Sequence, residues 1–354
     1  MIGKRIAQAR KSASLSLRAL AEVVGVSQTT ISKYEKEQST PDSTMLIKLA
    51  KALGVKVAYF FKVDSGVTLS NLEYRKRKVS QKELESIKSK VINLIEKRFE
   101  LESFYPKAES VKFEVPDGLP KSVQFQYNID GIAQKLREIW NLGEDPIADL
   151  SETLESKGIK VFMIDESAEN NFDGLAGLAN GEQIITISKD WSGDRQRFTL
   201  AHELGHLMLE GRLNSKLDEE RASDRFAGAF LLPEKALKER LGENRKSLEI
   251  AELAMIKAEF GVSMQVVFIR ANQVKIISYE YSNSLWKLFK KEGWDKKEPS
   301  EPYPNEKVQR FRQLVLRAVS EECISESKGA ELLDMTVKKF HNYRMTGKID
   351  CSYS

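Results

Sequence analysis

The stretch RFTLAHELGHLMLEGRLNSKLDEERASDRFAGAFLLP, residues 197–233, holds two of the three histidines in this chain of 354 residues. His202 and His206 lie four positions apart, among apolar residues whose spacing predicts a buried helix. Side chains four apart share one face of a helix, so these two imidazoles can bind a single metal ion. Glu203 then lies beside that ion and is not a ligand. The HExxH pattern therefore predicts a zinc site on a helix.

A third ligand is needed, because catalytic zinc sites use three protein ligands and leave one position open for water. The two cysteines form no CxxC pair and, like the third histidine, are distant in the sequence. Glu220 follows His206 by fourteen residues and opens a second helix with an apolar stripe. We take Glu220 as the third ligand. Asp224, one helical turn later, is expected to contact the outer nitrogen of His202 and fix its tautomer.

The first 62 residues form a basic segment with helical periodicity. They contain eleven Lys or Arg and four acidic residues, so their net charge is 11 − 4 = +7, against +4 for the whole chain. Ser16 is placed to cap a helix at Leu17–Val24, Gly25 to turn the chain, and Ser27 to cap a second helix. This order predicts a helix-turn-helix that approaches DNA phosphates and base edges. The candidate DNA contacts are Arg18, Ser27, Gln28, Thr29, Thr30, Ser32 and Lys33.

The whole chain is expected to be mainly α with a small sheet. We predict four parts: an all-α helix-turn-helix domain at 1–64, a helical linker at 65–118, an α+β zincin-like metallopeptidase domain at 119–275, and a helical C-terminal region at 276–354. The linker is expected to be a charged helix from residue 71 to residue 104. Its basic run at 75–78 is interpreted as a solvated face in preference to a DNA contact.

Within the third part, periodicity predicts helices near 122–140 and 145–157 and strands at 158–164, 174–179 and 183–188. Asn180 and Gly181 predict the turn between the last two strands. One of these two strands is expected to offer an edge that holds an extended peptide by main-chain hydrogen bonds. A helical pair with a turn at Gly261 follows. Residues 306–345 are expected to form a small helical unit that serves packing or dimer contact.

Both ends of this organisation resemble known families. Residues 1–62 resemble the Xre/Cro repressors, down to the ending STPDSTMLIKLAKALGV, and the pair RFTLAHELGH and DRFAGAFLLP resembles the ImmA/IrrE metallopeptidases, which are gluzincin-like, over about residues 120–270. The second resemblance implies that the residues binding Zn²⁺ are His202, His206 and Glu220. It implies that Glu203 is the catalytic base of peptide-bond hydrolysis. Glu210 is a departure, because many family members have a histidine there.

The favoured function is a DNA-binding transcriptional regulator with a zinc-dependent endopeptidase domain that cleaves a repressor, in trans or within itself. The alternatives are a DNA-binding regulator whose peptidase fold is a non-catalytic sensor, and an antitoxin-like module that binds DNA and a partner protein. The intact set of four site residues favours the first, because a sensor does not need Glu203.

Expected partners are double-stranded operator DNA, a repressor-type protein substrate and a second copy of the chain, because helix-turn-helix proteins commonly read paired half-sites. No apolar run has the length of a signal peptide or a membrane span, so the expected location is cytoplasmic, without a membrane partner. The chain has only two cysteines, which also argues against a disulfide framework.

Overall fold

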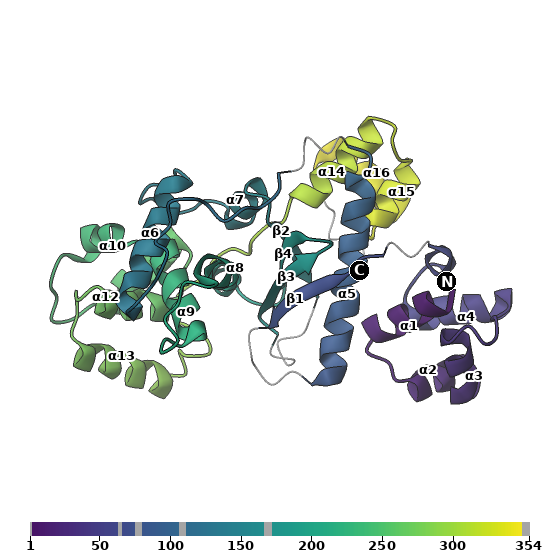
Figure 1. Ribbon diagram of the computed structural model, residues 1–354, viewed down its shortest axis with the longest axis horizontal. Coiled ribbons are helices and arrows are strands. Elements are labelled where there is room, and N and C mark those ends of the chain that lie inside the picture. Colours follow the sequence, from purple (N-terminus) through teal and green to yellow (C-terminus); the bar gives the residue numbers. More distant parts are fainter. Residues whose placement is uncertain (1, 63–65, 75–79, 106–110, 166–171, 349–354) are drawn as a thin grey trace.

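The computed structural model describes residues 2–62, 66–74, 80–105, 111–165 and 172–348. It is mainly helical, with one four-stranded sheet near the middle of the molecule and helices on both faces of that sheet (Figure 1). The expected fold class, mainly α with a small sheet, is confirmed. No helix in the described ranges is long and apolar enough to cross a membrane.

The N-terminal helices form a separate small bundle. They are α1 (Ile2–Ser12), α2 (Leu17–Val24), α3 (Gln28–Glu35), α4 (Ser43–Leu53) and the 3-10 helix η1 (Val57–Phe61). As expected, the Ser16 and Ser27 side chains accept hydrogen bonds from the first turns of α2 and α3, and Gly25 ends α2 with a φ of 79°. The bundle closes over its own apolar core, whose fully buried members are Ile6, Leu20, Ile31, Leu49 and Phe60.

The expected linker contains a strand that we did not predict. Residues Leu69–Tyr74 form β1, where a helix from residue 71 was expected, and helix α5 (Gln81–Glu102) begins only at the capping box of Ser80 and Glu83. The prediction was wrong because β1 is formed by hydrogen bonds to a strand about one hundred residues later, which local periodicity does not report. The basic run at 75–78 lies outside the described residues.

The other three strands, β2 (Lys160–Ile164), β3 (Gly174–Ala179) and β4 (Glu182–Ser188), lie within two residues of their predicted limits. Asn180 and Gly181 both have positive φ, at 50° and 82°, as a two-residue hairpin turn requires. The strand order is β1-β3-β4-β2, with β2 parallel to β4 and the other pairs antiparallel. The prediction that β3 or β4 offers a free edge to a peptide is therefore wrong, because β1 pairs with β3 and β2 pairs with β4.

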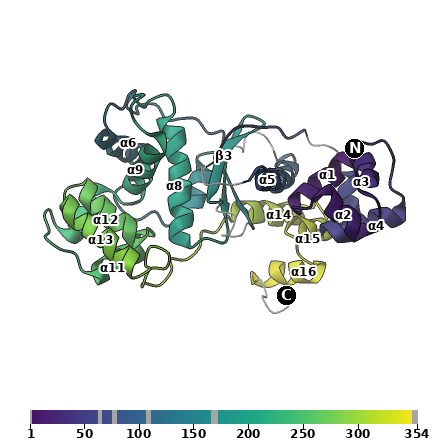
Figure 2. The same cartoon turned by 90° about the horizontal axis from the view of Figure 1, so that it is seen from below.

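Two helices cover the two faces of this sheet. On one face, Ile87, Val91 and Ile95 of α5 belong to one buried cluster with residues of β2, β3 and β4. On the other face lies α8 (Gly193–Leu209), whose Leu200, Ala201 and Leu204 share the main core with the opposite sides of the same strands. Figure 2 shows α8 and α5 on opposite sides of β3. The histidine-bearing helix is thus held directly against the sheet.

More helices complete the core around α8: α6 (Ile129–Ile139), α7 (Leu150–Ser156), α9 (Glu219–Leu231), α10 (Glu234–Leu241), α11 (Ile250–Phe260) and α12 (Met264–Gln273). The helix expected from residue 122 begins seven residues later, after the short 3-10 helix η3 (Gln126–Asn128), because the main chain of Val123 instead pairs with residues 212 and 214. The helix expected from residue 145 begins at Leu150, after its cap Asp149. The helical pair around Gly261 is present as expected.

The C-terminal region divides between two cores. Helix α13 (Tyr279–Lys291) places Leu285 and Phe289 in the main core, so the expected boundary at residue 275 falls inside one packed unit. After an irregular strap at 301–309, three short helices pack against Leu101 of α5. They are α14 (Arg310–Ser320), α15 (Glu326–Leu332) and α16 (Val337–Thr346).

The strap is fixed by a buried carboxylate. Oε1 of Glu306 accepts from Nη1 of Arg197 on α8 at 2.7 Å, and Oε2 accepts from the main-chain N–H of Ser151 on α7 at 3.0 Å. Both side chains of the ion pair are nearly inaccessible, at 1% and 4% exposure. One side chain therefore joins the strap, α7 and the helix that carries the histidines.

Candidate metal centre

Helices α8 and α9 approach each other closely enough to share one site. A Cβ at Gly205 of α8 would lie 3.1 Å from Cδ1 of Phe226 and 3.2 Å from Cα of Ser223 on α9, so even an alanine would be tightly packed at this crossing. This approach brings the first turns of α9, with their acidic residues, over the HELGH segment. This close packing is possible because α8 has small and apolar residues where it faces α9.

Three side chains converge at this crossing. The Nε2 atoms of His202 and His206 are 3.0 Å apart, and the carboxylate oxygens of Glu220 lie 3.6 Å and 3.7 Å from them. Each of the three residues offers a ligand atom, and these atoms all lie within 4.8 Å of one another. Two imidazole nitrogens and one carboxylate form the donor set of catalytic zinc sites. The donor set and its spacing fit one small divalent ion.

The outer nitrogens of both imidazoles face carboxylates. Nδ1 of His202 lies 2.8 Å from Oδ1 of Asp224, and Nδ1 of His206 lies 3.4 Å from Oε1 of Glu219. Because an ionised carboxylate can only accept, both Nδ1 atoms carry the proton and donate it. Both Nε2 lone pairs therefore point at the space beside Glu220, where a cation removes their repulsion.

Asp224 thus lies where the sequence placed it, and Glu219 was missed. The available signal for Glu219 was its position next to Glu220 in the first turn of the same helix.

Glu203 lies on the side of α8 that faces β3, with 1% of its surface exposed. A Cβ at Gly174 would be 3.5 Å from Oε1 of Glu203 and 2.6 Å from Cγ2 of Thr199, so only glycine fits at the start of β3. The main chain at the start of β3 therefore passes directly beside the carboxylate of Glu203.

The candidate DNA-contacting residues lie at the start of α3 and near it. Gln28, Thr29 and Lys33 are exposed, and Ser32 is half-buried. Ser27 and Thr30 hydrogen-bond each other through their hydroxyls at 2.8 Å, which gives both a local structural role. Arg18 on α2 is exposed and pairs with Glu22 at 2.9 Å. The structure therefore places Gln28, Thr29 and Lys33 on one accessible surface, with Arg18 on the preceding helix.

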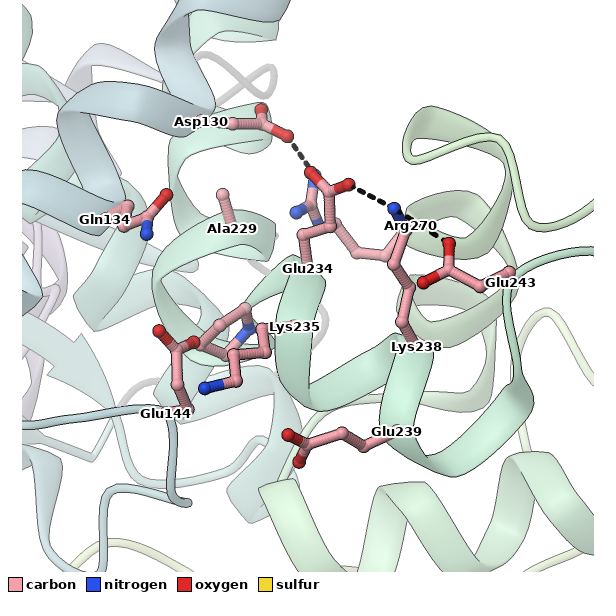
Figure 3. A pocket seen from close by; sticks show the side chains of 11 residues that line it. Asp130, Gln134, Glu144, Ala229, Glu234, Lys235, Lys238, Glu239, Glu243 and Arg270 are labelled. Atoms are coloured by element: carbon pink, nitrogen blue, oxygen red, sulfur yellow. Dashed lines mark hydrogen bonds and ion pairs between the residues drawn. The ribbon is translucent and has the colours of Figure 1, made fainter.

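A separate cavity of about 430 Å³ contains none of the histidines. Figure 3 shows its charged lining, which includes four glutamates and two lysines. The lining also includes Arg270 and Asp130, whose side chains form an ion pair at 3.0 Å. Burial lowers the pKa of Arg270. Asp130 also pairs with Arg225 at 2.6 Å, so this cluster connects α6, α9 and α12. We interpret it as a structural ion network, because the carboxylate of Asp130 on α6 holds guanidinium groups of α9 and α12 together.

Comparisons with known proteins match two separate segments of the chain. Residues 6–60 match the helix-turn-helix family model, and residues 154–272 match the model described as IrrE N-terminal-like domain. A stretch of 77 residues, 22% of the chain, is 35% identical to repressor protein C2 of Salmonella phage P22 and covers 35% of that protein.

A stretch of 60 residues, 17% of the chain, is 38% identical to an uncharacterized transcriptional regulator in the ATPase CF(0) region of Rhodospirillum rubrum, of which it covers 56%. The chain thus spans about a third and about half of the lengths of these two relatives. The matches confirm the two resemblances that the motifs indicated.

Proposed function

We propose that this chain, which joins an Xre-type helix-turn-helix domain to an ImmA/IrrE-type metallopeptidase-like domain, is a DNA-binding regulator that hydrolyses a peptide bond in a repressor-type protein. The observation that carries the proposal is the convergence of His202, His206 and Glu220, with Glu203 buried beside them. A fold retained only for sensing needs the metal ligands at most, whereas the carboxylate of Glu203 is the group that hydrolysis requires.

In the proposed reaction the two histidines and Glu220 hold Zn²⁺. When bound there, the ion supplies Lewis-acid chemistry, lowering the pKa of water and polarising a carbonyl group. Glu203 accepts the proton of the attacking water and returns it to the leaving amine. Asp224 and Glu219 keep both imidazoles in the tautomer that directs Nε2 at the ion.

The proposed DNA surface is the exposed side of α3. Gln28 is suited to an adenine edge, Thr29 to a thymine methyl group or a phosphate, and Lys33 to a phosphate. Support comes from the net charge of +7 over residues 1–62 and from the helix-turn-helix family match. Helix-turn-helix proteins commonly bind paired half-sites, so we propose that two copies of the chain bind the two half-sites of an operator.

The experiment combines metal content with proteolysis. Purified wild type, His202→Ala and Glu203→Gln are analysed for zinc and then incubated with candidate repressors and alone. We expect zinc in wild type and Glu203→Gln but not in His202→Ala, and fragments only with wild type. His341→Ala is the matched histidine control, because His341 is exposed on α16 and pairs with Glu326 outside the site.

Other results would redirect the proposal. Zinc in wild type, without fragments from the repressors or the chain itself, would favour the sensor or the antitoxin-like reading. Absence of zinc in wild type would remove the metal site altogether and leave a DNA-binding protein.

A further inference from the structure

The edge of β3 is occupied by a strand from a distant part of the chain. β1 pairs antiparallel with β3, with Leu69 opposite Ala179, Ser70 opposite Leu178 and Tyr74 opposite Leu175. Its last residues lie by the beginning of β3, where Gly174 contacts the surroundings of Glu203. An extended peptide that adds to a sheet edge would pair with β3 in the same manner. β1 therefore stands where a peptide beside Glu203 would be bound.

The pairing of β1 is less regular than that of the other strands. Its register shifts between Ser70 and Glu73, whereas β2 and β4 pair through five consecutive positions, and β3 and β4 through six. A bulge of this kind interrupts the hydrogen-bond ladder. β1 is also an edge strand held on one side only. It is thus the strand of this sheet that can leave with the smallest loss of main-chain hydrogen bonds.

We propose that β1 is an internal occupant of the peptide-binding edge of β3, and that an extended peptide binds there only when β1 is displaced. The inference rests on the proposed function for the role of that peptide as a substrate. It makes the intact chain a restrained enzyme whose own N-terminal part blocks access to the site. The ligand class is an unfolded or extended polypeptide segment, because a folded one has no free main chain to offer.

Displacement of β1 would be transmitted to the helix-turn-helix domain. β1 precedes α5, and α5 makes polar contacts with the helix-turn-helix domain. Nη1 of Arg5 lies 2.6 Å from Oε2 of Glu96, and the hydroxyls of Ser14 and Ser86 are 2.8 Å apart. The opposite face of α5 packs on the sheet. One helix therefore joins the peptide edge to the DNA-binding unit.

The test measures peptide binding with catalysis removed. The full chain carries Glu203→Gln, and the probe is a fluorescent synthetic peptide with the sequence of residues 66–74, GVTLSNLEY. Ser70→Pro removes a main-chain N–H that the ladder directs at β3, because Thr68 accepts from Asn180 and alternate residues face the same strand. Ser70→Ala is the matched control, since it loses the hydroxyl and keeps that N–H.

We expect Ser70→Pro to bind the peptide at least about tenfold more tightly than Ser70→Ala, because a tethered strand competes at an effective concentration of order millimolar. A second variant, Ser70→Cys with Leu178→Cys and with the native cysteines replaced by serine, locks β1 when oxidised. It is expected to lose peptide binding and to regain it on reduction.

Equal peptide affinity in Ser70→Pro and Ser70→Ala, with hydrogen exchange showing β1 released, would overturn the inference. So would undiminished binding in the oxidised lock. If the Ser70→Pro variant binds the peptide and zinc, but the same variant with Glu203 restored cleaves nothing, the proposed function fails and the inference stands.

Discussion

The carboxylate behind His202 is expected to strengthen metal binding, and Asp224→Asn tests this. The wild-type contact of 2.8 Å between Nδ1 and Oδ1 is a full hydrogen bond to a charged acceptor. Loss of such partners of metal-bound histidines typically costs about 10–100-fold in metal affinity. Because the Asp224 side chain is 48% exposed, we expect the lower end, about tenfold, which equals about 1.4 kcal/mol.

Glu219→Gln is the matched comparison. Its contact with Nδ1 of His206 is longer, at 3.4 Å, and its side chain is 58% exposed, so we expect a change of less than about threefold. The assay is competition for zinc against a chromophoric chelator, with circular dichroism to confirm that both variants are folded. Equal zinc affinities for wild type and Asp224→Asn, or a larger loss in Glu219→Gln, would refute the assigned roles of these carboxylates.

Three further predictions concern other parts of the molecule. Glu306→Ala leaves Arg197 buried without its carboxylate and should lower the free energy of unfolding by about 3–5 kcal/mol in urea titrations, whereas Glu321→Ala, in an exposed pair, should cost less than about 1 kcal/mol. Lys33→Ala should weaken DNA binding equally for all sequences and reduce the slope of log K against log salt concentration by about 0.9. Gln28→Ala should instead relax the sequence preference at one base pair. The control Lys135→Ala should change neither the salt dependence nor the sequence preference. The hydroxyl of Tyr59 donates to Asn93 of α5, and burial raises the pKa of Tyr59 from 10.0 to about 12. The folded state therefore keeps the phenol protonated to a higher pH than the unfolded state does. The stability that this adds is complete below pH 10 and is lost as the pH rises toward 12. Spectroscopic titration of tyrosinate should show one late-titrating phenol in wild type that is missing in Tyr59→Phe. Absence of this late titration from wild type would contradict the prediction.

Features that are encoded over one or a few helical turns could be predicted from the amino-acid sequence. The caps at Ser16 and Ser27 and the glycine after α2 specified the helix-turn-helix, because each acts through main-chain groups within three or four residues. The HELGH spacing and the four-residue step from Glu220 to Asp224 specified which side chains share a helix face. The β3–β4 hairpin followed from Asn180 and Gly181, where positive φ is favoured.

How these elements meet depends on contacts between distant parts of the chain. The strand β1, the contact from Glu219 to His206 and the strap fixed by Glu306 all depend on partners between 13 and 155 residues away. Their local sequences are compatible with several conformations, and the choice is made by hydrogen bonds and burial that exist only after the chain has closed on itself. For the same reason the sequence identified the four residues of the candidate metal centre, whereas the tertiary structure revealed which segment covers the strand beside it.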